Sequence, residues 1–521
     1  MLQAEGTTTG PQPRDGAELF IGLVAPVGTD HDLLSEILVD TLRSFGYETV
    51  LVRLAQLLHT YPRYQKLPKN PVDAYIRSHQ KAGNDFRWLA ESADALAVLG
   101  IGAVREARKG RNQDERKIIP SCAYIIRSLK TPQEVATLRS VYGNAFVLIG
   151  SSAHYEVRRR FLATAIATSH HSFQYEQFLP TAESLMLIDQ EEFGEVFGQN
   201  LRNTYYLSDI FVDASETKHL RDSVERGLEL LFGNTFHTPG KDEYAMFLAM
   251  GAALRSAELG RQVGAVIAND AGSVLALGTN EVPKVNGGLY WAGDQPDYRE
   301  FVMREDSNDK YKKGLLVDLL SRLKEDGWLS DERAKIDPTE LAAIALDDKQ
   351  SPSISDAQLR HLIEFMRAVH AEMAALTDAA LRGVSTAGST MYVTTFPCHL
   401  CAPHIVAAGI KRVVYLEPYV KSRAVQLYPD SVAVDQSDAR HPQVPFEPFV
   451  GVALRKYIDL FTMLRRKKNG KVIDFERANA QQRYSSSPAA YTAEEKVHVG
   501  ALETVIEPKR SILEQQEFAY E

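Results

Sequence analysis

Two short motifs, separated by one expected strand, constrain the fold of this chain more than any other feature. The first is His370-Ala-Glu372, inside an alanine-rich apolar run, and the second is Pro-Cys398-His-Leu-Cys401. Residues 389–396 between them ("STMYVTTF") are rich in β-branched and aromatic side chains and predict a strand. A helix, a strand and the start of a second helix are therefore expected to bring one histidine, one glutamate and two cysteines together.

The spacing of these residues suits a metal site. Cys398 and Cys401 are three apart at the start of an expected helix, so both sulfurs can point the same way, and a helix N-terminus favours the thiolate form. With His370 as the third ligand, zinc would keep a fourth position for water, as catalytic zinc does. Glu372 cannot share the direction of His370 on a regular helix, and we expect it to act as acid and base. The pattern matches the H-x-E…P-C-x-x-C signature of zinc nucleobase deaminases.

Each half of the pattern has another interpretation. A single histidine in an alanine-rich helix is usually packed in a core, and a single CxxC is more often a redox pair or half of a structural zinc site. His404 is available as a fourth ligand that would close such a site. Because both halves occur together in the expected helix, strand, helix order, the sequence favours catalytic zinc held by His370, Cys398 and Cys401.

The composition is typical of a globular protein with several domains. The chain has 521 residues, of which 44% are hydrophobic and 24% charged. No apolar run approaches the roughly 18–20 residues that span a bilayer, and the N-terminus lacks the basic and apolar regions of a signal peptide. Three cysteines cannot form a disulfide framework in a chain of this length, which favours the cytoplasm. The net charge of -9 disfavours a large nucleic-acid interface.

The order of expected elements predicts an α/β protein with two domains. Strand, glycine turn, helix and strand open the first domain as a parallel α/β fold. The second follows the order α-β-β-α-β-α-β, with one long helix over residues 361–383. We expect a disordered lead-in (1–18), the first domain (19–170) and a helical connector (171–235). The second domain (236–470), with an insertion at about 290–355, and a flexible tail (471–521) follow.

The end of the first expected strand resembles a phosphate-binding loop. Gly22 and Gly28 enclose "GLVAPVG", but Thr29 and Asp30 stand where a Walker A motif has lysine and serine or threonine. We therefore expect a P-loop nucleotide-kinase-like domain with weak or absent phosphoryl transfer and a regulatory role, in which Gly22, Gly28 and Thr29 are the candidate nucleotide contacts. Asp30 also predicts a helix N-cap. Basic residues in segments that resemble nucleotide-kinase lids are either further phosphate ligands or solvated helix charges: Arg127, Lys130 and Arg139.

The second domain resembles the deoxycytidylate deaminase branch of the cytidine deaminase superfamily over about residues 240–430. The resemblance rests on "RQVGAVI", "GTNEVP", "HAE", "TTFPCHLC" and "VVYLEPY". It implies a cytidine-deaminase-like α-β-α fold and a contact between Asn280 and the nucleotide sugar. The family's "GxNGxP" reads "GTNEVP" here, with Glu281 in place of the second glycine. With "RSAELGRQVGA", "GTNEVPKVNGGLYW", "EPYVKSRAVQLYPDS" and the first domain, the chain is similar to two-domain bacterial anti-phage dCTP/dCMP deaminases.

This resemblance implies a zinc-dependent hydrolase that converts dCTP or dCMP to dUTP or dUMP and ammonia, depleting dCTP during phage infection. Arg261 and Lys284 lie near the motifs and are either contacts for substrate phosphates, surface charges or contacts to another subunit. The resemblance also implies a homo-oligomer such as a hexamer and, in some members, an inhibitory RNA; a nucleotide effector is expected at the first domain. Two alternatives stay open: a deaminase of RNA or single-stranded DNA, and a non-catalytic sensor with structural zinc.

Overall fold

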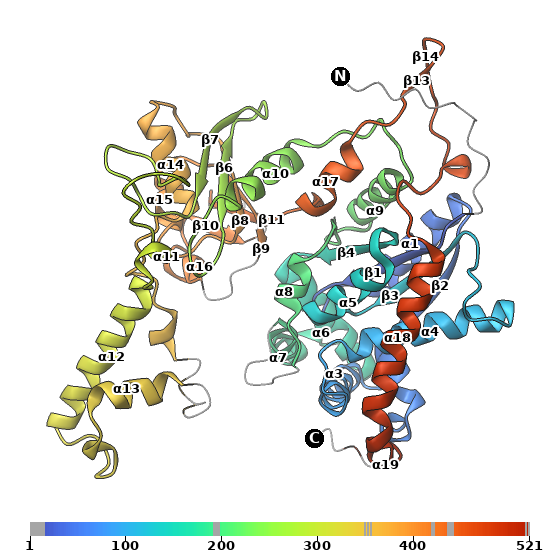
Figure 1. Ribbon diagram of the computed structural model, residues 1–521, viewed down its shortest axis with the longest axis horizontal. Coiled ribbons are helices and arrows are strands. Elements are labelled where there is room, and N and C mark those ends of the chain that lie inside the picture. Colours follow the sequence, from blue (N-terminus) through green and yellow to red (C-terminus); the bar gives the residue numbers. More distant parts are fainter. Residues whose placement is uncertain are drawn as a thin grey trace. The chain divides into compact units, whose positions relative to one another are not determined.

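A computed structural model shows two compact units in this chain (Figure 1). Unit 1 comprises Met1–Glu243 together with Val450–Glu521, and unit 2 comprises Tyr244–Phe449. The chain thus leaves unit 1, forms unit 2 and returns to unit 1. The structure describes residues 16–190, 198–347, 351, 354, 357–417, 422–434, 442–515 and 518; most of the expected lead-in at 1–18 lies outside these ranges.

The sheet of unit 1 has β1 at its centre. Its described strands follow the order β12-β5-β4-β1-β3-β2. Neighbouring strands are parallel except β12, which pairs antiparallel with β5. This arrangement confirms a mixed α/β fold with a largely parallel sheet, whereas the kinase-like assignment stays a prediction. In the same order, the strands are Gly451–Val452, Ile210–Asp213, Phe146–Ser152, Leu19–Val24, Cys122–Arg127 and Glu48–Arg53.

Helices pack around this sheet. Asp30 accepts hydrogen bonds from the backbone N–H groups of Asp32 and Leu33, which confirms the predicted N-cap of α1. Helix α1 packs against α9, and α4 packs against α5 and α18. The helices of unit 1 are α1 (His31–Ser44), α2 (Leu54–Leu57), α3 (Val72–Leu89), α4 (Ala95–Asn112), α5 (Pro132–Tyr142), α6 (Tyr155–Ser169), α7 (Leu179–Gln190), α8 (Leu201–Tyr206), α9 (Thr217–Leu231), α17 (Leu454–Phe461), α18 (Pro488–Ile506) and α19 (Arg510–Leu513).

The segment 171–235 differs from the helical connector that we expected. It contains β5, which pairs with β4 so that Ile210 lies opposite Ile149. The short run "DIFVD" is buried in the sheet, but its four-residue strand is too brief for an alternation pattern to show. The first α/β unit therefore continues past residue 170 to Glu243.

The C-terminal segment corrects the prediction of a flexible tail at 471–521. Residues 488–506 form α18, which packs along α4 in Figure 1. Its polar composition suggested disorder, yet Tyr491 and Glu495 are buried. The reason is that α18 packs through a buried ionic contact, which an apolar pattern cannot reveal.

That contact is a cluster of three fully buried charged residues. Arg108 of α4 donates to Glu18 (Nη2 to Oε2, 2.8 Å) and to Glu495 (Nη1 to Oε2, 2.6 Å). Glu18 also accepts hydrogen bonds from the hydroxyl groups of Tyr124 and Tyr491. The cluster joins Glu18, the residue before β1, to helices α4 and α18, so it links three segments of unit 1 that lie far apart in the sequence.

Replacing Arg108 with alanine should lower the free energy of unfolding by about 3–5 kcal/mol, because two carboxylates would remain buried without their cation. Lys109→Ala is the matched control, since Lys109 pairs with Glu106 at the surface and such pairs contribute about 0–1 kcal/mol. Urea denaturation followed by circular dichroism measures both. Equal effects of the two substitutions would contradict this role of Arg108.

The sheet of unit 2 is mixed. Its described strands follow the order β10-β11-β9-β8-β6-β7. Strand β6 is antiparallel to β7 and β8, and the other neighbours are parallel. In that order, the strands are Val432–Val434, Val444–Pro448, Arg412–Glu417, Thr390–Thr395, Gly264–Ala268 and Val274–Thr279; the separate hairpin β13–β14 of unit 1 is Lys467–Lys468 and Lys471–Val472.

Two glycines let helices approach this sheet closely. A Cβ atom on Gly278 of β7 would lie 2.0 Å from the carbonyl oxygen of Ala371, and one on Gly264 of β6 would lie 1.9 Å from that of Ala249. The first contact fixes the start of α14 against β7. The helices concerned with unit 2 are α10 (Lys241–Ala253), α11 (Glu300–Met303), α12 (Ser307–Glu325), α13 (Pro338–Leu346), α14 (Ala371–Leu381), α15 (Ala402–Ala407) and α16 (Ala424–Leu427).

The helix that we expected over 361–383 begins only at Ala371. His370 is its N-cap residue, with an extended backbone (φ -63°, ψ 151°). Val369 forms an isolated antiparallel bridge with Glu281, and this pairing holds the chain extended up to the helix. The apolar residues before 370 therefore imitate a helical pattern without forming one.

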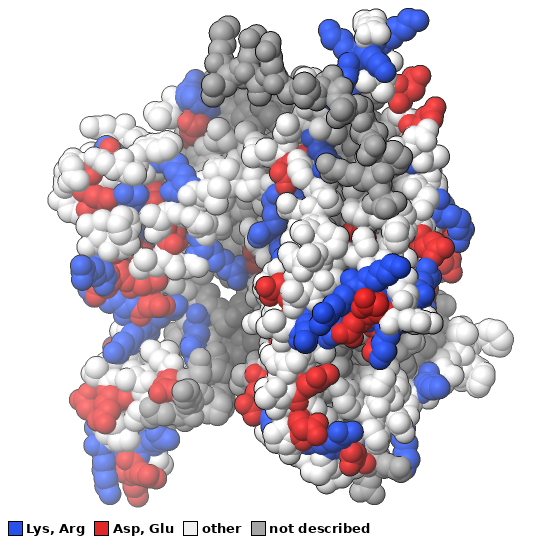
Figure 2. Space-filling view, turned by 45° about the vertical axis from the view of Figure 1, so that its right-hand side comes forward, with Lys and Arg blue, Asp and Glu red and all other residues white. Residues whose placement is uncertain are grey.

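The insertion after β7 is partly helical, as predicted, and contains α11, α12 and α13. Its surface charges are mixed: Lys310 pairs with Glu305, and Arg322 with Asp318. On the face of the molecule shown in Figure 2, lysine and arginine side chains likewise lie interspersed with aspartate and glutamate.

Among the described residues, no helix combines the length and the apolar character that crossing a membrane requires.

Candidate functional site

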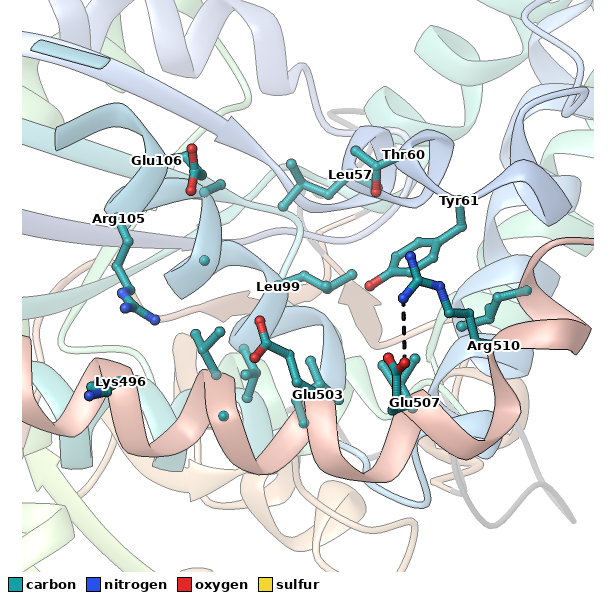
Figure 3. A pocket seen from close by; sticks show the side chains of 18 of the residues that line it. Leu57, Thr60, Tyr61, Leu99, Arg105, Glu106, Lys496, Glu503, Glu507 and Arg510 are labelled. Carbon is teal, nitrogen blue, oxygen red and sulfur yellow. Dashed lines mark hydrogen bonds and ion pairs between the residues drawn. The ribbon is translucent and has the colours of Figure 1, made fainter. Parts of the chain in front are cut away.

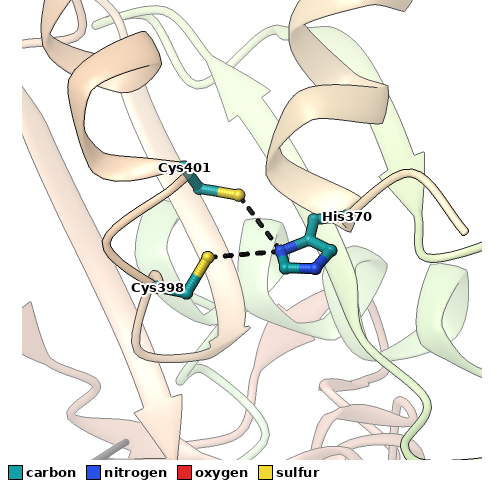
Figure 4. A group of neighbouring side chains, drawn as sticks. All are labelled: His370, Cys398 and Cys401. Atoms are coloured by element: carbon teal, nitrogen blue, oxygen red, sulfur yellow. Dashed lines mark hydrogen bonds between the residues drawn. The ribbon is translucent and has the colours of Figure 1, made fainter. Parts of the chain in front are cut away.

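The three predicted metal ligands lie together in unit 2 (Figure 4). His370 Nδ1 is 3.3 Å from Cys398 Sγ and 3.3 Å from Cys401 Sγ. The three side chains come from two segments that are separated in sequence by β8. Both cysteines are buried and His370 is half-buried, so the group faces a partly enclosed space.

Local backbone structure fixes each side chain. His370 projects from the extended residue that caps α14, and Cys398 follows the end of β8. The N–H of Cys401 donates to the carbonyl oxygen of Cys398 (3.1 Å) in a tight turn, and Cys401 caps α15. The turn brings the two sulfurs to the same side, as the CxxC spacing predicts.

This donor set fits zinc. Two thiolates and an imidazole are typical zinc ligands, with bond lengths of about 2.3 Å to sulfur and about 2.0–2.1 Å to nitrogen. A sulfur and a nitrogen on one tetrahedral zinc would then be about 3.5 Å apart, close to the observed 3.3 Å. Three protein ligands leave one position free, which is the arrangement of catalytic zinc.

Charge and hydrogen bonding within the group favour one thiolate. The hydrogen bond with Cys401 lowers the pKa of Cys398 to about 4, and His370 adds to this effect. Burial opposes protonation of His370, but its contact with Cys398 and the charge of Glu372 raise its pKa to about 9. The hydrogen bond that Cys401 makes with Cys398 raises the pKa of Cys401, and burial adds to this effect. Zinc binding would therefore release protons from the site.

Glu372 lies in the first turn of α14, next to this group. It is buried, and its carboxyl group is hydrogen-bonded to Cys401. Burial, with the charge of Cys398, raises its pKa to about 7. A carboxyl group with such a pKa can accept and donate a proton near neutral pH.

A closed structural site is not what the described residues form. His370, Cys398 and Cys401 form one group of potential metal ligands within 4.8 Å of one another, and this group includes no fourth side chain among the described residues. His404 is exposed on α15, and His399 is half-buried outside this group. The alternative in which His404 supplies a fourth ligand therefore has no support in this arrangement.

Asn280, the expected sugar contact, lies directly after β7 and is buried. Its Oδ1 accepts from the N–H of Val263 (2.7 Å), and its Nδ2 donates to the carbonyl oxygen of Arg261 (2.6 Å). The side chain is thus engaged in holding the segment before β6, and a sugar contact would have to use its remaining hydrogen-bonding capacity.

The two expected phosphate contacts are paired with carboxylates. Arg261 is half exposed and lies 2.7 Å from Glu417, and Lys284 lies 2.7 Å from Asp294. Lys284 lines a cavity of about 1070 Å³ along β7, whose lining includes neither Glu372 nor the metal-binding group. The structure does not bring Lys284 to that group.

The expected phosphate loop of unit 1 lies between β1 and α1. Gly22 belongs to β1, where a Cβ atom would lie 2.7 Å from Phe146, so packing explains this glycine. Gly28 has φ 91°, and a Cβ atom there would lie 2.7 Å from the carbonyl oxygen of Arg158. Thr29 is buried, and its hydroxyl finds no partner among the described residues.

A carboxylate from α7 contacts this loop, and sequence reasoning missed it. Asp189 is fully buried; its Oδ2 accepts from the N–H of Val27 (2.7 Å), and its Oδ1 accepts from Lys130 Nζ (2.5 Å). The other two basic candidates are also paired, Arg127 with Asp32 and Arg139 with Asp209. Asp189 is 161 residues from Gly28, so no local pattern could have indicated the contact.

Two further features lie outside the metal-binding group. A cavity of about 1000 Å³ in unit 1 is lined by α4 and α18 (Figure 3), and Arg105 and Arg510 at its rim pair with Glu115 and Glu507. In unit 2, three carboxylates lie within 4.8 Å of one another: Glu258, Glu300 and Asp306. Only folding brings these three together, since they are spread over 49 positions.

Comparisons with known proteins agree with this site. The family described as "Cytidine and deoxycytidylate deaminase zinc-binding region" matches residues 239–417. Deoxycytidylate deaminase of Enterobacteria phage T2 is 49% identical over 55 residues, which is 11% of this chain and 29% of the relative. ComE operon protein 2 of Bacillus subtilis is 47% identical over 53 residues, 10% of this chain and 28% of the relative. The alignments thus span less than a third of these relatives.

Among solved structures, the dCMP deaminase of cyanophage S-TIM5 in complex with dCMP and dUMP is 18% identical, with a TM-score of 0.23, and the match covers 41% of this chain and 100% of that chain. The family match includes His370, Glu372, Cys398 and Cys401. Residues 239–417 therefore contain a zinc-binding region of the type found in cytidine and deoxycytidylate deaminases.

Proposed function

We propose that this chain is a zinc-dependent hydrolase that deaminates free deoxycytidine nucleotides, dCTP, dCMP or both. One observation carries the proposal: His370, Cys398 and Cys401 lie together beside the buried carboxyl group of Glu372, inside a region that matches deoxycytidylate deaminases. The reaction consumes water and yields a deoxyuridine nucleotide and ammonia.

The three ligand residues would hold zinc, which when bound lowers the pKa of a water molecule and so supplies a nucleophile for C4 of cytosine. Glu372 accepts the proton of that water and passes it to N3 of the base. Glu372 then takes the remaining proton of the attacking oxygen as the C4 carbonyl forms and delivers it to the amino group, which leaves as ammonia. A carboxyl group with a pKa of about 7 suits both directions of transfer.

A free nucleotide is the favoured substrate because the chain carries a net charge of -9, which repels a polynucleotide backbone. Asn280 is proposed to position the sugar, and Arg261 the phosphates after exchange of its present partner Glu417. Lys284 is left out of this proposal because it lines a cavity that includes neither Glu372 nor the three candidate zinc ligands. The phosphate contacts would determine whether dCMP, with one phosphate, or dCTP, with three, is bound.

The substrate is tested with dCMP, dCTP, CTP, cytidine and a deoxycytidine oligonucleotide at equal cytosine concentration. We expect deamination of dCMP or dCTP, measured as deoxyuridine nucleotide by chromatography, and much slower reaction of cytidine and the oligonucleotide. Faster deamination of the oligonucleotide would replace this proposal with that of a polynucleotide deaminase.

The biological use that we propose is depletion of dCTP during phage infection, supported by the strings shared with two-domain anti-phage deaminases. Homo-oligomeric assembly, an inhibitory RNA and a nucleotide effector at unit 1 belong to the same proposal and rest on the same resemblance. Measurement of dCTP pools in infected cells that carry the intact chain or Glu372→Ala would test the use directly.

Unit 1 is proposed to regulate the deaminase without phosphoryl transfer. Thr29 and Asp30 stand where a Walker A loop has lysine and serine or threonine. In addition, Asp189 accepts hydrogen bonds from the N–H of Val27 in the loop and from the ammonium group of Lys130. With magnesium, ATP and nucleoside monophosphates, we expect no nucleoside diphosphate above the level of a no-protein control. Robust magnesium-dependent transfer, followed by thin-layer chromatography, would contradict this role.

A further inference from the structure

Glu281, which stands where the family motif has glycine, is one of the most deeply buried carboxylates of unit 2. It is 1% exposed. Its Oε2 accepts from the N–H of Ala257 (3.0 Å), and its Oε1 accepts from the N–H of Val282 (2.9 Å). A buried carboxylate is costly unless such donors compensate it. The side chain is therefore held in one orientation, in which Oε2 contacts Ala257 in the segment before β6.

The backbone of Glu281 contacts the residue next to the metal-binding histidine. The N–H of Val369 donates to the carbonyl oxygen of Glu281 (3.0 Å), and the two residues form an isolated bridge. His370 follows directly in an extended conformation. The direction in which the imidazole leaves the chain thus depends on where Glu281 lies.

The preceding residue adds to this arrangement. Asn280 holds Arg261 and Val263 through its side chain, and its carbonyl oxygen accepts from the hydroxyl of Ser256 (2.7 Å). The pair Asn280-Glu281 is therefore bonded along the segment 256–263 on one side and to Val369 on the other. Asn280 and Glu281 thus hold both the segment 256–263 and the residue before His370; we call these two residues the support.

Arg299 connects this support to the insertion. Its Nη1 lies 3.9 Å from Glu281 Oε2, and it is 8% exposed. Asp297 binds the same guanidinium with two oxygens, at 3.0 Å from Nε and 2.7 Å from Nη2. Arg299, which belongs to the insertion, thus supplies a buried cation to Glu281 and links the insertion to that residue.

We infer that Glu281 is a positioning residue for the zinc-binding group, and that Arg299 makes the insertion a part of that support. The expected change in kcat rests on the proposed function. The expected change in zinc affinity does not depend on it. Groups that orient zinc ligands from behind typically change metal affinity or activity by about 10–100-fold when they are replaced.

The test compares Glu281→Gly, Glu281→Gln and Arg299→Lys with Asp378→Asn in the full chain. Asp378 lies on α14 in a partly exposed pair with Arg382, so its substitution removes a carboxylate from the same helix as Glu372 without touching the support. Zinc affinity is measured by competition with a chromogenic chelator, and kcat and KM are measured for dCMP and dCTP.

For Glu281→Gly, we expect zinc affinity to fall by about 10–100-fold and kcat to fall more than KM rises. Glu281→Gln, which keeps one of the two accepting oxygens, should lie between Glu281→Gly and the unchanged chain, and Arg299→Lys should produce a smaller loss in the same direction. Equal zinc affinity and kcat in Glu281→Gly, Glu281→Gln and Asp378→Asn would overturn the inference.

Failure of the proposed function gives a different result. If the unchanged chain deaminates neither nucleotide, the proposed function is wrong, and the chelator competition alone then decides the role of Glu281. Should Glu281→Gly fail to fold, as judged by circular dichroism, the comparison of Glu281→Gln with Asp378→Asn decides in its place.

Discussion

Replacing Glu372 with glutamine is expected to lower kcat for deamination by about 10²–10⁴-fold while zinc stays bound. Glutamine keeps the shape of the side chain and can still form hydrogen bonds in the buried position. It cannot accept the proton of water or return it to N3 and the leaving amino group. The loss should therefore appear in kcat, with zinc content unchanged in metal analysis of the purified protein.

Asp378→Asn provides the control for this prediction, because it changes a carboxylate to an amide on the same helix but in a partly exposed ion pair. Its kcat should equal that of the unchanged chain. Retention of full activity by Glu372→Gln would show that another group performs the proton transfers. Loss of zinc together with activity would show that Glu372 acts as a ligand or supports one.

Substitution of Cys401 by serine is expected to remove zinc and, with it, all measurable deamination. A serine hydroxyl is a poor zinc ligand, and two remaining ligands cannot hold the ion in place of three. The variant should also lose the stabilisation that metal binding adds to unit 2. That stabilisation would reach about 4 kcal/mol at a free zinc concentration 1,000 times the dissociation constant.

Cys122→Ser is the matched control, since Cys122 is the third cysteine and lies in β3 of unit 1. Its zinc content and activity should match those of the unchanged chain, although removal of a buried sulfur in a sheet can lower stability. Treatment with a chelator should reproduce the effect of Cys401→Ser, and added zinc should reverse it. Undiminished zinc binding by Cys401→Ser would contradict the ligand assignment.

Local patterns were sufficient to predict the elements that carry the site. The Asp30 cap, the strands β1, β6, β7 and β8, and the CxxC turn each depend on residues close together in sequence. The proximity of His370 to both cysteines was also predictable, because the motif spacing and the helix-strand order together leave few other arrangements.

Contacts between distant residues could not be predicted in this way. Arg108 pairs with Glu495, a carboxylate 387 positions away, on a helix in the segment that we expected to be a flexible tail. Asp189 contacts the loop at Val27 across 162 positions. Glu281 was noticed as a departure from glycine, but its bond to Val369 became visible only when the chain before Ala371 proved to be extended.

The central claim is hydrolysis of the cytosine amino group of a free deoxycytidine nucleotide, and the stoichiometry of the products tests it most directly. The zinc-loaded chain is incubated with dCMP and, separately, with dCTP; deoxyuridine nucleotide is quantified by anion-exchange chromatography and ammonia by an enzymatic assay. We predict one ammonia for each deoxyuridine nucleotide from at least one substrate, and formation of both products by Glu372→Gln that is slower by about 10²–10⁴-fold. Absence of both products from both nucleotides, with zinc bound, would contradict the account.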